Sequence, residues 1–137
     1  MPFVMDVSVT ATWIFPDENH PYATAAFARL SNDSGLVPCL WWFELRNVLV
    51  VNERRRRLTE VDTASFLRDI ERFRIIHDTA PDHAEIMRLA RTRGLTVYDA
   101  AYLELAQRHG VALATVDEAL IRAARLESVS LVGESTP

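Results

Sequence analysis

The sequence contains no lysine, so all 15 of its basic residues are arginine. Its single cysteine, Cys39, excludes an internal disulfide, and a structural zinc site is not expected. Glycine (4 residues) and proline (6 residues) are both sparse, which argues against linkers and low-complexity segments. No apolar run is long enough to cross a membrane, and the first residues lack the basic stretch of an export signal. We therefore expect one globular domain over residues 1–137, located in the cytoplasm.

Acidic residues outnumber arginines by 19 to 15, which gives a formal net charge of −4. This balance by itself argues weakly against nucleic-acid binding. The run Arg54–Arg57 could contact an RNA backbone, but four consecutive helical residues point in all directions around the helix axis. We interpret this run as a solvated helix end, where cations complement the helix dipole.

Short apolar runs alternate along the chain with segments of helical periodicity. The expected strands are 3–7, 35–38, 74–77, 111–114 and 128–132, and the expected helices are 20–30, 41–57, 59–73, 81–93, 98–109 and 117–126. Strands that are apolar on both faces and separated by helices predict a mostly parallel sheet covered by helices on both sides. In such folds functional side chains gather beyond the carboxyl ends of the strands.

Asp6 and Glu44 are acidic residues in surroundings that the sequence predicts to be apolar. Asp6 falls within or at the end of the first strand, where aspartate is rare and seldom buried without a partner. Glu44 lies three residues after Trp41 and four before Val48, so it projects from the apolar side of its own helix. Such a carboxylate must be paired or bound to a cation, because burying a lone charge is prohibitively costly.

Asp99 and Asp117 stand where predicted helices begin. Asp99 opens the helix 98–109 and shares the face of its apolar residues, and Asp117 follows the strand 111–114 directly. A helix that starts just after a strand holds its first carboxylate at the carboxyl edge of the sheet. All four carboxylates can therefore meet at one edge.

Each of these carboxylates also has a purely structural interpretation, which the sequence leaves open. Asp6 could cap the segment that follows it, and Glu44 could pair with one of the arginines. The segment from Thr96 to Asp99 is similar to a capping box. Thr115 could cap the last helix.

Four converging carboxylates would need a cation or protons to neutralise them. Two unit charges ~4 Å apart repel by about 4 kcal/mol at an effective dielectric constant near 20. Several such pairs would consume a large part of a typical folding stability of about 5–15 kcal/mol. A site made only of carboxylate oxygens favours Mg²⁺ or Mn²⁺, and such ions activate water for phosphodiester hydrolysis. The arrangement therefore points to a metal-dependent phosphodiesterase.

Four segments carry a resemblance to a known family. They are Val4–Val9 (VMDVSV), Phe43–Leu49 (FELRNVL), Thr96–Ala106 (TVYDAAYLELA) and Leu113–Leu120 (LATVDEAL). Taken together, in this order and in a chain of this length, they resemble the motifs of PIN-domain ribonucleases. The chain looks in particular like a VapC-type toxin of a VapBC toxin–antitoxin pair.

The resemblance implies a three-layer α/β/α fold around a five-stranded parallel sheet. It also implies that Asp6, Glu44, Asp99 and Asp117 bind Mg²⁺ or Mn²⁺, with Thr115 contributing a hydroxyl beside Asp117. The activity that it implies is cleavage of RNA. The partners that it implies are a second copy of the chain in a homodimer or higher assembly, and a VapB-like antitoxin.

Three other classes of protein remain as alternatives. A phosphoacceptor receiver domain is also a small α/β fold with acidic strand ends, but such domains use a lysine that this chain lacks. A catalytically inactive PIN-like binding module is disfavoured by the intact carboxylates. A DNA nuclease or a flap-type nuclease is disfavoured because the chain is too short for the extra clamp elements of such enzymes.

The remaining aromatic residues and the cysteine are interpreted from their place in the helical pattern. Trp41 fits the core side of its helix, whereas Trp42 lies off it and is better suited to an interface. Tyr98 and Tyr102 flank Asp99 and are interpreted first as packing residues, with contact to a substrate or partner as the alternative for either. Cys39 is interpreted as a small buried apolar residue.

Overall fold

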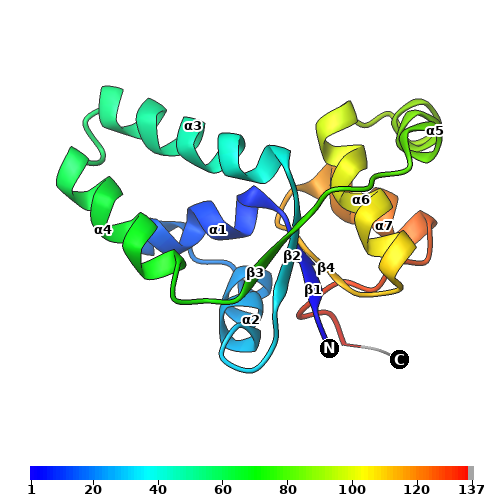
Figure 1. Cartoon of the computed structure of the whole chain (residues 1–137), viewed down its shortest axis with the longest axis horizontal. Coiled ribbons are helices and arrows are strands. Elements are labelled where there is room, and N and C mark those ends of the chain that lie inside the picture. The colour runs from blue at the N-terminus through cyan, green and yellow to red at the C-terminus, as the bar shows by residue number, and fades with distance from the viewer. Residues whose placement is uncertain (136–137) are drawn as a thin grey trace.

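The computed structural model describes residues 1–135, apart from the side chain of Pro16, and consists of helices around a small sheet (Figure 1). Its elements are β1 (Phe3–Met5), α1 (Val7–Ile14), the 3-10 turn η1 (Pro16–Glu18), α2 (Pro21–Arg29), β2 (Gly35–Pro38), α3 (Leu40–Arg54), α4 (Glu60–Ile70), β3 (Ile75–Asp78), α5 (His83–Arg93), α6 (Val97–His109), β4 (Leu113–Ala114) and α7 (Glu118–Leu126). None of the helices in this part of the chain combines the length and apolar character that a membrane span requires.

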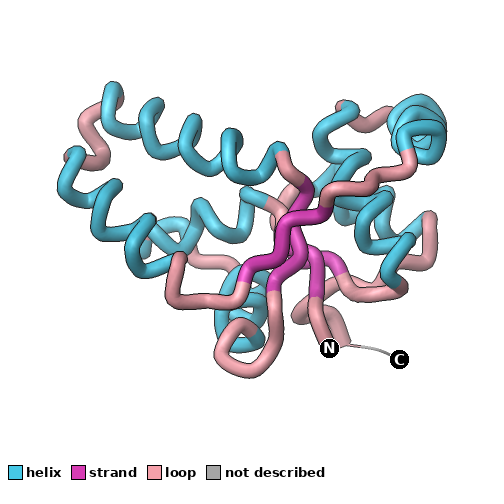
Figure 2. The backbone as a smooth tube through the Cα atoms, in the orientation of Figure 1, coloured by secondary structure: helices cyan, strands magenta, loops and turns pink. Residues whose placement is uncertain are grey.

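The strands form one sheet in the order β3-β2-β1-β4, in which every neighbouring pair is parallel. Phe3, Val4 and Met5 of β1 are fully buried, as expected for a strand covered on both faces. The predicted parallel α/β class is therefore confirmed. Helices flank the strands on both sides, which gives the three layers (Figure 2).

The helices divide between the two faces of the sheet. Helices α1 to α4 lie on one side, with α3 and α4 extending together as an arm, and α5 to α7 lie on the other (Figure 1). The chain after β1 thus leaves toward one face, and the chain after the neighbouring β4 leaves toward the other. Where adjacent strands diverge in this way, a crevice opens at their carboxyl ends.

The expected fifth strand is reduced to one bridge, so the prediction of a five-stranded sheet is wrong by one strand. Leu131 pairs with Leu113 in parallel, and Leu113 donates a hydrogen bond to the Ser130 carbonyl (2.8 Å) and accepts one from Val132 (3.0 Å). β4 has only two residues, so it offers little backbone for a further strand. Gly133, with φ of 90°, turns the chain away directly afterwards.

Helix α1 was not expected, because the first strand was predicted to run to residue 7 and no helix was assigned after it. Its sequence, VSVTATWI, is rich in β-branched residues and alternates apolar and polar residues, which favours a strand. The structure instead has a helix that packs on α2 and α3. Tertiary packing outweighs local propensity here.

Helix α6 is the central helix of its face and packs on β1, β2 and β4. Its residues from Ala100 to Ala106 are all buried, including the carboxylate-bearing Glu104. The helix ends at Gly110, and α5 ends at Gly94, both with positive φ near 63° as predicted for glycine at a helix end. The N-cap residue of α6 is Thr96, so Asp99 lies in the first turn of this helix.

Candidate active site

Asp6 follows β1 immediately and is almost completely buried, with 3% of its surface exposed. Its backbone N–H donates to the Ala114 carbonyl (2.9 Å), which continues the ladder between β1 and β4. Its Oδ2 accepts hydrogen bonds from the hydroxyls of Ser8 (2.7 Å) and Thr115 (2.8 Å). Asp6 occupies the N-cap position of α1, but its side chain makes no capping hydrogen bond. The carboxylate is thus directed to the crevice between β1 and β4.

Burial raises the pKa of Asp6 to about 6, because removing a carboxylate from water disfavours its charged form. The hydrogen bonds from Ser8 and Thr115 oppose this shift. The negative charges of Asp99 and Glu44 add to it, which places these two carboxylates within electrostatic range of Asp6.

Glu44 lies on α3, is half-buried, and accepts a short hydrogen bond from the phenol of Tyr102 on Oε1 (2.6 Å). Among the described residues, no arginine forms an ion pair with it, so the alternative of an arginine partner is wrong. Burial and the charge of Asp99 raise the pKa of Glu44, and the Tyr102 hydrogen bond lowers it.

Asp99 lies in the first turn of α6, where its backbone N–H donates to the Thr96 hydroxyl (3.0 Å). Thr96 is the N-cap residue, but the reciprocal bond of a capping box is not among the hydrogen bonds of the described residues. The Asp99 carboxylate thus does not complete a capping box. Burial and then the charge of Asp117 raise the pKa of Asp99, and a hydrogen bond with Thr96 lowers it.

Asp117, rather than Thr115, is the N-cap residue of α7, and its Oδ2 accepts from the backbone N–H of Leu120 (2.9 Å). The alternative that Thr115 caps this helix is thus wrong. Thr115 is fully buried and its hydroxyl accepts from the Asp117 N–H (3.1 Å) while it donates to Asp6. This hydroxyl links two of the four acidic residues.

The structure gathers all five predicted residues at the carboxyl edge of the sheet, although to different degrees. Asp6 and Thr115 are in direct contact, whereas Glu44, Asp99 and Asp117 are related to the others through their charges. These residues come from the ends of β1 and β4, from α3, and from the starts of α6 and α7. Their common place at this edge agrees with the topological argument, and their role as metal ligands stays a prediction.

Three of the carboxylates share a pattern of anchoring through one oxygen. Asp6 is held at Oδ2, Glu44 at Oε1 and Asp117 at Oδ2, and within residues 1–135 the second oxygen of each accepts no hydrogen bond. Hard divalent cations prefer carboxylate oxygens, so the donor set fits such an ion. In this arrangement no three acidic, histidine or cysteine side chains of the described residues meet closely enough to hold one ion.

Two side chains of the site were not identified from the sequence as functional. Ser8 donates to Asp6, accepts from the Val116 backbone N–H (3.1 Å) and lies 3.3 Å from the Thr115 hydroxyl. Tyr102 was interpreted as a packing residue, which it is, but its hydroxyl also reaches Glu44. The available signal for Ser8 was its place two residues after Asp6, within the segment Val4–Val9 that resembles a family motif.

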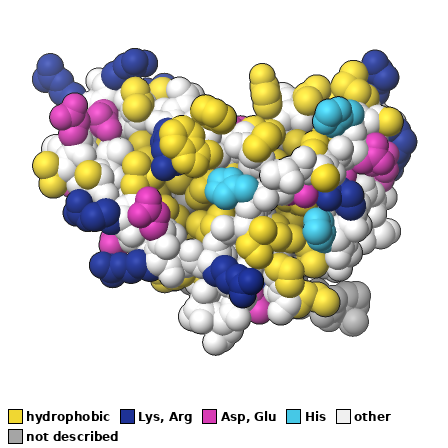
Figure 3. Space-filling model, in the orientation of Figure 1, with side chains coloured by type: hydrophobic (Ala, Val, Ile, Leu, Met, Phe, Trp, Pro, Cys, Tyr) yellow, Lys and Arg dark blue, Asp and Glu magenta, His cyan; other side chains and the backbone are white. Residues whose placement is uncertain are grey.

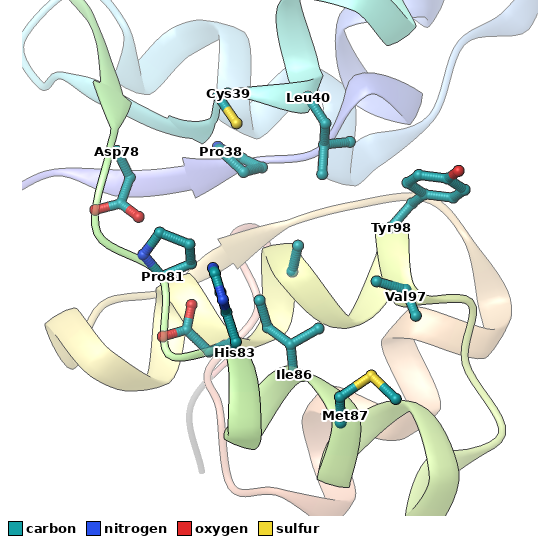
Figure 4. Close-up of a pocket in the computed structure, with 12 residues that line it drawn as sticks. Pro38, Cys39, Leu40, Asp78, Pro81, His83, Ile86, Met87, Val97 and Tyr98 are labelled. Carbon is teal, nitrogen blue, oxygen red and sulfur yellow. The ribbon is translucent and has the colours of Figure 1, made fainter.

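A separate apolar pocket of about 360 Å³ lies beside the site, between the start of α3 and helices α5 and α6 (Figure 4). Its apolar lining residues include Leu40, Ile86, Met87 and Val97, and none of the five predicted site residues is among those that line it. Cys39 and Tyr98 also border this pocket and are exposed, so the predictions of a buried cysteine and a packed Tyr98 are wrong.

Comparison with known proteins identifies the family of this chain. The family model of the PIN domain matches residues 3–126. Ribonuclease VapC3 of Pyrobaculum aerophilum is 32% identical over 123 residues, which cover 88% of this chain and 92% of that protein. The chain therefore belongs to the PIN domain family, and it is of the VapC type within that family.

Two solved structures share the fold at lower sequence identity. VapBC2 from Rickettsia felis, bound to a DNA fragment from its promoter, matches with a TM-score of 0.67 and 15% identity over 96% of this chain and 97% of that chain. FitAcB from Neisseria gonorrhoeae matches with a TM-score of 0.56 and 20% identity over 94% of this chain and 95% of that chain. At these identities the likeness concerns the fold alone.

Proposed function

We propose that the protein is a Mg²⁺-dependent endoribonuclease that acts as the toxin of a type II toxin–antitoxin pair. The observation that carries the proposal is the set of four carboxylates at the carboxyl edge of the sheet, three of which are anchored through one oxygen. Burial and mutual repulsion raise the pKa values of Asp6, Glu44 and Asp99. A bound cation would lower these pKa values, since it favours the charged form of every carboxylate near it.

In this proposal Asp6, Glu44, Asp99 and Asp117 hold Mg²⁺, or Mn²⁺ in its place. When bound, such an ion stabilises charge on phosphate oxygens and lowers the pKa of a water molecule so that it can attack phosphorus. The protein's own contribution is to hold Asp6, Glu44 and Asp117 each through one oxygen. Thr115 orients Asp6 and Asp117 together, so that the ends of β1 and β4 act as one unit.

The relatives of this chain support the proposed substrate and the proposed partner. The relative VapC3 is named a ribonuclease, which supports RNA as the substrate. The VapBC2 and FitAcB structures support an antitoxin partner in a similar fold. In Figure 3, apolar side chains gather over the middle of the face that is shown. On α3, Trp42 and Phe43 expose 43% and 70% of their surfaces. Such aromatic exposure suits a protein interface with an antitoxin or a second copy.

The activity is tested with purified protein and a mixture of cellular RNAs in Mg²⁺ or Mn²⁺. We expect cleavage with either ion and none after addition of excess EDTA. Undiminished cleavage in EDTA by a preparation free of contaminating nuclease would exclude the metal mechanism. A well-folded protein that cleaves no RNA under any of these conditions would favour the inactive binding module instead.

The toxin role is tested by induced expression in a bacterial host. We expect growth arrest from the chain alone and relief when the small reading frame next to its gene is co-expressed. Sequencing of RNA ends after induction identifies the target. Normal growth of a host that contains soluble, RNA-cleaving protein would contradict the toxin role while leaving the nuclease intact.

A further inference from the structure

Tyr102 is the largest fully buried side chain of the described chain, and its phenol is directed at a carboxylate. It lies on α6, three residues after Asp99, and none of its surface is exposed. Its hydroxyl donates to Glu44 Oε1 at 2.6 Å, across 58 residues of sequence. This hydrogen bond joins α6 to α3 at the level of the acidic cluster.

The hydrogen bond between Tyr102 and Glu44 has one direction. The phenol hydroxyl donates, because an ionised carboxylate only accepts. Tyr102 therefore supplies the donor at Oε1 of Glu44.

Packing alone does not require a tyrosine at this position. Phenylalanine would supply the same ring, and burying an additional hydroxyl is unfavourable unless it finds a hydrogen-bond partner. The partner here is Glu44, whose long side chain otherwise rotates about several bonds. Holding Oε1 removes most of this freedom and leaves Oε2 without a hydrogen bond within residues 1–135.

We propose that Tyr102 is a positioning residue for the cation site, which holds Glu44 through Oε1 so that Oε2 is ready to bind the ion. The proposal rests on the proposed function of the four carboxylates. Tyr102 itself touches neither the ion nor the RNA. Its role is that of a residue that hydrogen-bonds to a metal ligand and orients it. Mutation of such a residue commonly weakens metal binding by about 10–100-fold.

The test is the Mg²⁺ dependence of thermal stability without RNA, because an ion that binds only the folded state raises its melting temperature. For Tyr102→Phe we expect the Mg²⁺ concentration at half-maximal shift to rise by about tenfold or more. Tyr98→Phe is the matched control, since it removes a hydroxyl from the exposed side of the same helix. It is expected to leave the Mg²⁺ midpoint unchanged.

A second comparison separates positioning from general packing. In a Glu44→Gln background the Mg²⁺ midpoint is already altered, and adding Tyr102→Phe should change it no further. An equal further increase in that background would overturn the proposal, because Tyr102 would then act independently of Glu44. A wild-type midpoint in the Tyr102→Phe single variant would overturn it as well.

The failure of the proposed function gives a different result. If the wild-type melting temperature does not respond to Mg²⁺ or Mn²⁺, the four-carboxylate site and the role of Tyr102 both fail. If the wild-type protein responds and Tyr102→Phe responds equally, only the role of Tyr102 fails. Should Tyr102→Phe be unstable, all proteins are measured in sucrose, which is excluded from protein surfaces and favours the folded state.

Discussion

Thr115 donates a hydrogen bond to Asp6 Oδ2 at 2.8 Å, although the two residues lie 109 positions apart. One follows β1 and the other follows β4, the two strands from which the chain leaves toward opposite faces of the sheet. The bond therefore joins the two strand ends at the crevice between them. The same Thr115 hydroxyl accepts from the Asp117 N–H, so it also positions the backbone of Asp117.

Thr115→Val tests this link, since valine has nearly the shape of threonine but no hydroxyl. We expect the free energy of unfolding to fall by about 1–3 kcal/mol, because Asp6 loses a donor and the Asp117 N–H loses its acceptor. RNA cleavage should fall with it. Thr115→Ser keeps the hydroxyl and should retain most of the activity. Equal behaviour of the two variants in urea denaturation and in cleavage would contradict the role of the hydroxyl.

The raised pKa of Asp6 predicts a pH dependence of stability in EDTA. Its ordinary value of 3.8 applies to the unfolded chain, and burial raises it to about 6 in the folded protein. The folded state therefore binds the proton more tightly. This favourable contribution is fully present below about pH 4 and is lost as the pH rises through 6, by about 3 kcal/mol in all.

The dependence is measured as the difference in free energy of unfolding between wild type and Asp6→Asn. The difference is needed because Asp33, Asp78 and Glu127 have lowered pKa values and give the opposite trend. We expect the wild type to lose stability relative to Asp6→Asn from pH 4 to pH 6. A difference that stays constant over this range would contradict the raised pKa of Asp6.

Arg108 is expected to be the most important arginine for stability. It bonds to buried Glu104 (2.6 Å) and to Asp78 (2.7 Å), and so ties the end of β3 to α6. Arg108→Ala leaves the Glu104 carboxylate with the Asp82 N–H as its one remaining donor among the described residues. We expect a loss of roughly 3–5 kcal/mol, as for other buried charges that lose their partner.

The control for Arg108→Ala is Arg54→Ala, at the exposed end of α3. Surface substitutions of this kind usually change stability by less than about 0.5 kcal/mol. Urea denaturation of both variants measures the difference. Similar losses for the two would show that the Glu104 and Asp78 contacts contribute little.

Sequence patterns predicted the fold class well where periodicity and helix ends agreed. The helices before Gly94 and Gly110 end where expected, because a glycine in the left-handed region is a local feature, whereas their first residues differ from the prediction by one or two positions. Helix α1 was missed, since its β-branched residues favour a strand locally and only packing on α2 and α3 makes it a helix. The predicted fifth strand is reduced to one bridge because its partner, β4, has only two residues with which to pair.

The acidic residues of the site were predictable because each stands out against its own surroundings in the sequence. The groups that orient them were harder to predict. The bond from Tyr102 to Glu44 spans 58 residues, and nothing in the local pattern distinguishes a buried tyrosine that packs from one that also donates. Likewise the exposure of Cys39 depends on the neighbouring pocket, which forms only when α5 and α6 are in place.

The central claim is that four mutually repelling carboxylates form a cation site for RNA cleavage, and Asp99→Asn tests it most directly. Asparagine keeps the size of the side chain but removes one charge, and it would serve a helix cap nearly as well. The measurement combines RNA cleavage with melting curves in EDTA and in excess Mg²⁺. We expect cleavage to fall by orders of magnitude and the EDTA melting temperature to stay equal or rise. The Mg²⁺-induced increase should become smaller than in wild type. Full cleavage together with the full Mg²⁺-induced increase would remove Asp99 from the site and contradict the account.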